Sequence, residues 1–202
     1  TLGTPRARAT SRMTSVCSAP DLSFPMVLAK FESFHRDQLN VALHLLTTPL
    51  VFLGYMSIAA KAMGPGVLAG AALAYFLSLP FCMNAKEGVV YVSVGVFAVL
   101  VVAARRFARR GWASVVATTL VGALGQAAAH HLTGERAYME TYVAECRQGV
   151  IVRMTSLFFE QAFFQIPLVL SVSRPGWWPV MLAVALVAMV VPARTTRGRR
   201  EE

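Results

Sequence analysis

Hydrophobic positions along the chain gather into long runs that are separated by short polar breaks. A helix that crosses a bilayer needs roughly 17–25 mostly apolar residues, and several of the runs only just reach that length. The pattern predicts an all-α fold, a polytopic membrane helix bundle with about four to six spans. The runs occupy about residues 41–62, 66–84, 88–104, 112–132, 151–172 and 176–192.

Two other segments have the spacing of amphipathic helices that lie in the membrane interface. In residues 22–36, apolar side chains recur every three or four positions and the charged ones fall elsewhere on the helical wheel. Asp37 is then expected to cap a new helix. Residues 135–150 show a similar stripe, formed by Tyr138, Met139, Tyr142, Val143 and Cys146. This stripe is either a lid over a nearby site or a solvated connector between two helices.

The run 112–132 is rich in small residues, among them Gly122, Gly125 and Ala127–Ala129. In membranes, such residues let two helix backbones approach closely. We therefore expect this span to pack tightly against a neighbouring helix.

Composition supports a membrane protein. The chain of 202 residues is 56% hydrophobic and only 14% charged, with a mean hydropathy of +0.56, whereas soluble domains are about 25% charged. The net charge of +9 comes from basic clusters that lie beside apolar runs. Such clusters are typical of contacts with anionic lipid and of topology signals, so nucleic acid is not an expected partner.

The domain organisation follows from the same pattern. Residues 1–20 are expected to form a disordered or targeting tail, 21–192 a single membrane-embedded domain, and 193–202 a charged tail. With six spans, 13 of the 19 Lys and Arg residues fall on the side that holds both termini. The positive-inside rule therefore predicts that both termini are cytosolic. The three cysteines are far apart and indicate no disulfide framework, and nothing in the sequence indicates an oligomeric state.

The candidate chemistry lies in the four histidines. His35 and His44 flank the start of the first span, whereas His130 and His131 end the fourth run. Four passes through the membrane return the chain to its starting face, so both pairs are predicted to lie at the same face. Imidazoles near a bilayer core are costly without partners, which favours a shared metal ion.

The spacing around His44 sets conditions on this site. Asn40 precedes His44 by four residues and therefore shares its helix face. His35 precedes His44 by nine residues, which on one continuous helix would place the two on opposite faces. His35 can join the site only if the chain bends near Asp37.

The second pair adds a carboxylate. Glu135 follows His131 by four residues, and Gly134 between them is a good helix terminator, so Glu135 is expected to reach the site from a loop. His130 lies about 100° around the helix from His131. Histidines with one carboxylate are typical ligands of non-haem Fe(II), but zinc accepts three histidines and a water equally well.

These residues form a pattern that resembles the 2-hydroxy fatty acid dioxygenases of phytosphingosine breakdown, which are endoplasmic-reticulum membrane proteins. The first block of that family is a His, an Asn, a His and a Pro at fixed spacing. The second is a His with a Glu four residues on, and the third a Gln followed by a Pro. The matching residues here are His35, Asn40, His44 and Pro49, then His131 and Glu135 (with His130 where the family has Gly), then Gln161 and Pro167.

The resemblance implies an Fe(II)-dependent enzyme in the endoplasmic-reticulum membrane. A 2-hydroxy long-chain fatty acid would lose its carboxyl carbon to give a fatty acid one carbon shorter, with molecular oxygen consumed. His35, His44 and His131 would bind the iron, with His130 beside them. Asn40 and Glu135 would support the reaction.

Three other functions are considered. A diiron membrane desaturase needs clustered boxes with more histidines than the four present. A haem-binding electron carrier could use His44 and His131 as axial ligands, although these lie at the ends of spans. A non-enzymatic scaffold or lipid-binding protein would keep the fold without the metal.

Overall fold

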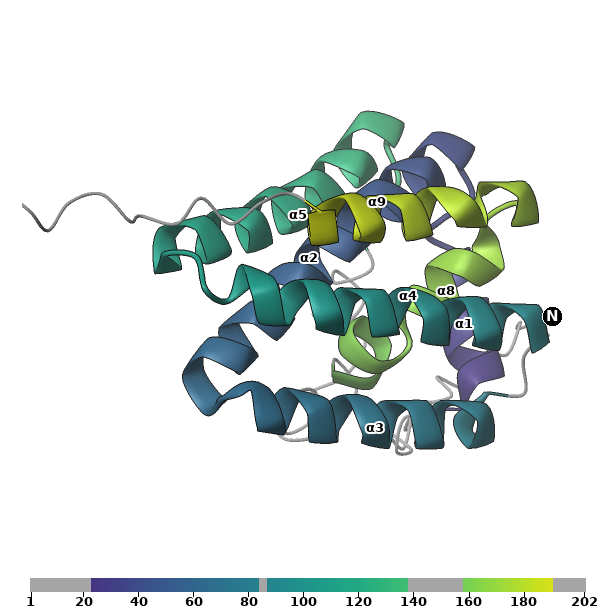
Figure 1. Ribbon diagram of the computed structural model, residues 1–202. Coiled ribbons are helices and arrows are strands. Elements are labelled where there is room, and N and C mark those ends of the chain that lie inside the picture. The colour runs from purple at the N-terminus through teal and green to yellow at the C-terminus, as the bar shows by residue number, and fades with distance from the viewer. Residues whose placement is uncertain (1–22, 84–86, 138–157, 191–202) are drawn as a thin grey trace, which may run out of the picture.

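The computed structural model describes residues 23–83, 87–137 and 158–190 of the chain (Figure 1). Within these ranges every regular element is helical, which confirms the predicted all-α class. The tails 1–20 and 193–202 and most of the segment 135–150 lie outside the described residues. The elements are α1 (Phe24–Glu32), α2 (Gln38–Met63), α3 (Pro65–Cys82), α4 (Glu87–Phe107), α5 (Trp112–Thr133), the π-helix Phe159–Phe163, α8 (Gln165–Val172), the 3-10 turn Pro175–Trp177 and α9 (Trp178–Val190).

Four of the described helices, α2 to α5, are long and apolar enough to cross a membrane. The fifth predicted run is described only from residue 158, where it is divided between the π-helix and α8. The last run forms α9, whose 13 residues extend about 20 Å at 1.5 Å per residue. A bilayer core is about 30 Å thick, which exceeds the described length of α9. The described residues therefore contain four helices long and apolar enough to span a membrane, within the predicted range of four to six.

Helix α2 is the centre of the bundle and contacts α3, α4, α5, α8 and α9. It runs antiparallel to α5. Gly54 lies against Thr119, whereas Thr48, earlier in α2, lies against Gln126, later in α5. It runs parallel to α4. Ser57 on α2 donates to the carbonyl of Ala104, and Lys61, one turn later on α2, donates to the carbonyl of Ala108, one turn after Ala104.

The contact between α2 and α5 depends on glycines, as the small residues of α5 predict. A Cβ atom added to Gly122 would lie 2.7 Å from the backbone nitrogen of Val51, and one on Gly125 would lie 2.6 Å from Cγ2 of Thr47. These distances leave no room for a methyl group. The two backbones approach so closely that Gln126 Nε2 also donates to Thr48 Oγ1 across the interface, at 3.1 Å.

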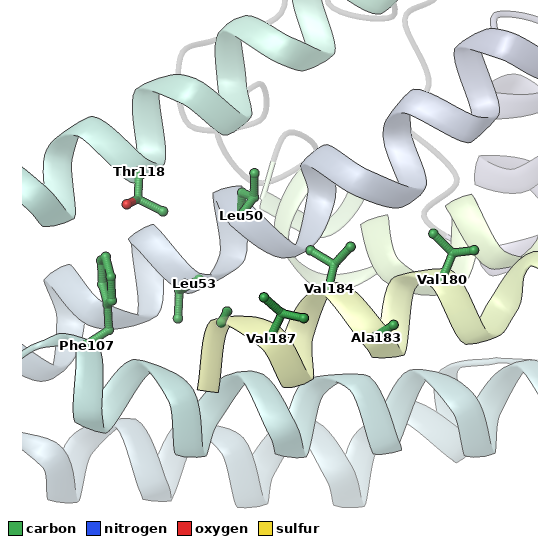
Figure 2. A pocket seen from close by; sticks show the side chains of 9 residues that line it. Leu50, Leu53, Phe107, Thr118, Val180, Ala183, Val184 and Val187 are labelled. Carbon is green, nitrogen blue, oxygen red and sulfur yellow. The ribbon is translucent and has the colours of Figure 1, made fainter. Parts of the chain in front are cut away.

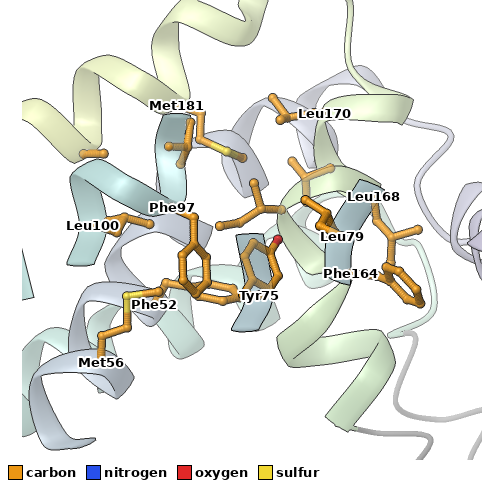
Figure 3. Close-up of a cluster of buried hydrophobic side chains, with 14 of the residues drawn as sticks. Phe52, Met56, Tyr75, Leu79, Phe97, Leu100, Phe164, Leu168, Leu170 and Met181 are labelled. Atoms are coloured by element: carbon orange, nitrogen blue, oxygen red, sulfur yellow. The ribbon is translucent and has the colours of Figure 1, made fainter. Parts of the chain in front are cut away.

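A hydrophobic core fills the other side of α2. It is built from side chains of α2, α3, α4, α8 and α9 (Figure 3). At its centre the rings of Tyr75 and Phe97 stack with centroids 4.0 Å apart, and Phe52 meets Phe97 edge to face at 6.3 Å. Aromatic pairs of this kind add to the energy of burial, so α3 and α4 are held against α2.

The predicted interfacial helix 22–36 packs against protein. It forms α1, but its apolar residues Phe24, Val27 and Phe31 are buried, and Phe24 contacts Phe164 edge to face at 5.3 Å. At the start of α9, Trp178 donates its indole N–H to the carbonyl of Leu170 at 3.0 Å. Both elements therefore help to close the bundle around α8.

Candidate metal centre

A turn between α1 and α2 positions the first histidine. Helix α1 ends at Glu32 and α2 begins at Gln38, with Asp37 as the N-cap, its Oδ1 accepting from the N–H of Leu39 at 2.7 Å. The predicted cap and the predicted bend are both confirmed. Because the chain changes direction here, His35 can face His44 although nine residues separate them.

Three histidines meet at this end of the bundle. His35 comes from the turn, His44 from the first third of α2 and His130 from the last turn of α5, and their exposed fractions are 5%, 4% and 8%. Their rings meet edge to face, with centroids 4.7 Å apart for His35 and His44, 4.9 Å for His35 and His130, and 5.1 Å for His44 and His130. The predicted meeting of the start of the first span with the end of the fourth is confirmed.

His35 is held in one orientation by the preceding helix. Its ring stacks on Phe31 with centroids 3.7 Å apart, and its Nδ1 lies 2.9 Å from the Phe31 carbonyl oxygen. A carbonyl only accepts, so Nδ1 carries the proton and Nε2 presents its lone pair. Burial lowers the pKa of His35 to about 4, although the Phe31 hydrogen bond opposes the shift. The imidazole is therefore neutral at pH 7, the form that binds metal ions.

Glu135 fastens the turn to the end of α5. Its Oε1 accepts from the backbone N–H groups of Arg36 at 2.7 Å and Asp37 at 3.0 Å, and its Oε2 accepts from Asn40 Nδ2. Burial would raise the pKa of Glu135, but these three hydrogen bonds outweigh it and lower the pKa. Gly134 makes this possible by ending α5 in the left-handed conformation, with φ +68°, as predicted from its type.

Asn40 lies between the carboxylate and a histidine. It is completely buried, and its Nδ2 is within 3.3 Å of the Phe34 carbonyl oxygen and 3.2 Å of His130 Nδ1. Its Oδ1 is buried without a hydrogen-bond partner among the described residues. Asn40 therefore orients the His130 ring.

The structure corrects one predicted ligand. His131, which the resemblance implies as a ligand, is exposed, whereas His130 occupies the position beside His35 and His44. The reason is helix geometry. The face of α5 that packs on α2 carries Gln126, and at about 100° per residue His130 lies about 40° from Gln126 but His131 about 140°. Reading the small-residue face of α5 through to its end would have selected His130.

The other predicted residues lie outside the three-histidine cluster. Gln161 is half-buried in the π-helix. Pro167 is buried in α8. The stripe from Tyr138 to Cys146, interpreted as either a lid or a solvated connector, lies outside the described residues.

The cluster fits a metal ion. One nitrogen from each of His35, His44 and His130 lies within 4.8 Å of the others, and both His35 Nε2 and His44 Nδ1 are buried without a hydrogen-bond partner among the described residues. Buried polar atoms without partners are costly, and coordination of an ion would satisfy them. Glu135 is engaged by three hydrogen bonds, so the donor set is three histidines. That set suits either Fe(II) or zinc.

Comparison with known proteins adds nothing to this geometry, since the chain matches no family model, no curated protein and no solved structure.

Proposed function

We propose that the protein is an Fe(II)-dependent dioxygenase of the membrane that converts 2-hydroxy long-chain fatty acids into fatty acids one carbon shorter. The observation that supports this most directly is the group of three buried histidines with nitrogens within 4.8 Å of one another. Bound Fe(II) would supply positions for molecular oxygen and for the carboxylate and hydroxyl of the acid. His35, His44 and His130 would hold the ion.

The surrounding residues would keep the three imidazoles in place. The Phe31 carbonyl fixes the proton of His35 on Nδ1, and Asn40 lies against His130. Glu135 ties the turn that carries His35 to the end of α5. Partners of this kind orient metal ligands and typically change metal affinity or activity by about 10–100-fold. The four long apolar helices of the bundle would provide the environment for an acyl chain.

The proposed reaction balances with one oxygen molecule per acid. Conversion of the hydroxyl-bearing carbon to a carboxyl removes three electrons, and release of the old carboxyl carbon as carbon dioxide removes one. One molecule of oxygen accepts these four electrons and leaves one water. Oxygen uptake and acid consumption should therefore be equal.

A haem carrier is less well supported by the same geometry. His44 and His130 meet edge to face, which leaves no space for a macrocycle between them, and His131 is exposed. The function as a scaffold or lipid-binding protein differs from the proposal in a measurable way, because it needs no metal.

The adjacent histidines provide a matched test. The protein is purified without oxygen, its iron and zinc are quantified, and turnover of 2-hydroxypalmitate is measured together with oxygen uptake. We expect about one iron per chain and one-to-one consumption. His130→Ala should abolish both iron binding and turnover, whereas His131→Ala should leave both intact. Stoichiometric zinc with no response to iron, or full turnover in His130→Ala, would contradict the proposal.

A further inference from the structure

A second feature is an apolar groove that runs along the middle of the bundle toward the end opposite the histidines. A groove of about 480 Å³ is open between α2, α5 and α9 (Figure 2). Leu50 and Leu53 form its floor, Val184 and Val187 one wall, and Phe107 its end. The proposed function does not use this groove.

The lining of the groove is hydrocarbon. Thr118 is the one lining residue with a polar side chain, and its hydroxyl donates to the Ser114 carbonyl at 2.9 Å. No polar group of the lining therefore needs a hydrogen-bond partner from an occupant. Because α2 and α5 are candidate spans, the groove faces the acyl-chain layer of a bilayer, and a hydrocarbon chain matches it.

The end of the groove is positively charged. Phe107 is the last residue of the span α4, and the Arg110 guanidinium carbon lies 4.5 Å from the centre of its ring. Lys61 Nζ donates to the carbonyls of Ala108 and Arg110, both at 2.9 Å, so a second positive charge is fixed on the same turn. A span end marks the level of the headgroups.

Three more arginines lie within two residues of Phe107 in the chain. Arg105, Arg106 and Arg109 are exposed, and no carboxylate among the described residues lies within 4.0 Å of them. The acidic residues of the described ranges lie toward the other end of the bundle, at α1, the start of α2, the start of α4, the end of α5 and the π-helix. They are Glu32, Asp37, Glu87, Glu135 and Glu160.

We propose that the groove and this basic turn together bind one anionic phospholipid, with an acyl chain along Leu50, Leu53 and Val184 and the phosphate at Arg105, Arg106 and Arg109. Arginine donors match phosphate oxygens in pairs, and each basic residue near an anionic headgroup strengthens binding about fivefold. Lys61 lies 17 residues beyond His44 on α2, about 25 Å away along the helix. The phosphate would therefore lie far from the metal centre.

The test uses the full chain in detergent micelles, titrated with phosphatidylglycerol or phosphatidylcholine and measured by native mass spectrometry. We expect phosphatidylglycerol to bind at least tenfold more tightly. The triple variant Arg105→Gln, Arg106→Gln and Arg109→Gln should lose about 100-fold in affinity for phosphatidylglycerol, since three such contributions multiply, and none for phosphatidylcholine. Arg109→Gln alone should lose about fivefold.

A second pair of variants tests the groove. Ala183 lines it and is exposed, so Ala183→Trp should fill it and weaken binding of both lipids. Ala117 is exposed on α5 outside the groove, and Ala117→Trp should bind as wild type does. Metal content and melting temperature check the fold of each variant. Equal affinity for the two lipids, an unchanged triple variant, or a lipid-free dimer that Ala183→Trp disrupts would overturn the proposal.

Discussion

Substitution of Gly122 by alanine should damage the metal centre from two helical turns away. Gly122 lies eight residues before His130, about 12 Å along α5, and touches no imidazole. A Cβ atom there would lie 2.7 Å from the backbone nitrogen of Val51, whereas ordinary contacts begin at 3.4 Å. Because the obstacle is backbone, it cannot rotate aside, and α5 must move away from α2.

The size of the effect follows from these distances. Restoring an ordinary contact requires α5 to shift by about 0.7 Å at Gly122. Overpacking of this kind costs about 1–3 kcal/mol. A site needs its ligands within about 0.5 Å of the working geometry, so the movement should also lower metal affinity. We expect a loss of about 10–100-fold, the range seen when the support of a ligand is disturbed.

The assay compares two alanine variants. Gly95 is exposed in α4 and a Cβ there meets nothing within 4 Å, so Gly95→Ala makes the same chemical change without the collision. Melting temperature and metal titration are measured for both purified proteins. Gly122→Ala should be less stable than Gly95→Ala by about 1–3 kcal/mol and should bind metal more weakly. If the two variants melt alike and bind metal as wild type does, the close contact of α2 and α5 does not position His130.

Three further variants test single contacts. Asn40→Ala should lower metal affinity or turnover by about 10–100-fold, and normal metal binding with only a lower melting temperature would indicate a purely structural role. Glu135→Gln keeps the shape but loses the charge that three N–H donors share. The turn that carries His35 should then be held less firmly to the end of α5, which should weaken metal binding. Unchanged metal affinity would show that the turn keeps its conformation without the Glu135 charge. Lys61→Met removes the charged donor of two carbonyls and should lower stability by about 1–3 kcal/mol. Its metal content should be normal, since Lys61 and the three histidines lie at opposite ends of α2. A loss of metal would contradict that separation.

Much of the architecture is readable from local signals in the sequence. Asp37 caps α2 and Gly134 ends α5, because a side-chain acceptor before a helix and a residue that tolerates positive φ after one act within a few residues. The span count places the start of α2 and the end of α5 at one face. These signals do not depend on how the helices are rotated against one another.

The rotation of each helix about its axis could not be predicted from the sequence. The resemblance implied His131 as a ligand, yet the face of α5 that carries Gly122 and Gln126 turns His130 inward. One residue of difference is about 100°, so the choice between adjacent histidines belongs to the packing of α5 on α2. The spacing between residues close in the chain does not determine how α5 packs on α2.

The role of Glu135 shows the same division. Its place after Gly134 in the sequence predicts a loop carboxylate near the histidines, and the structure confirms that position. Only the fold brings the backbone N–H groups of Arg36 and Asp37 to it, from 98 and 99 residues away. The sequence by itself determined the helices, their ends and the histidines that could meet. Tertiary packing decided which of them face one another, because that depends on helix rotations and backbone contacts between segments far apart in the chain.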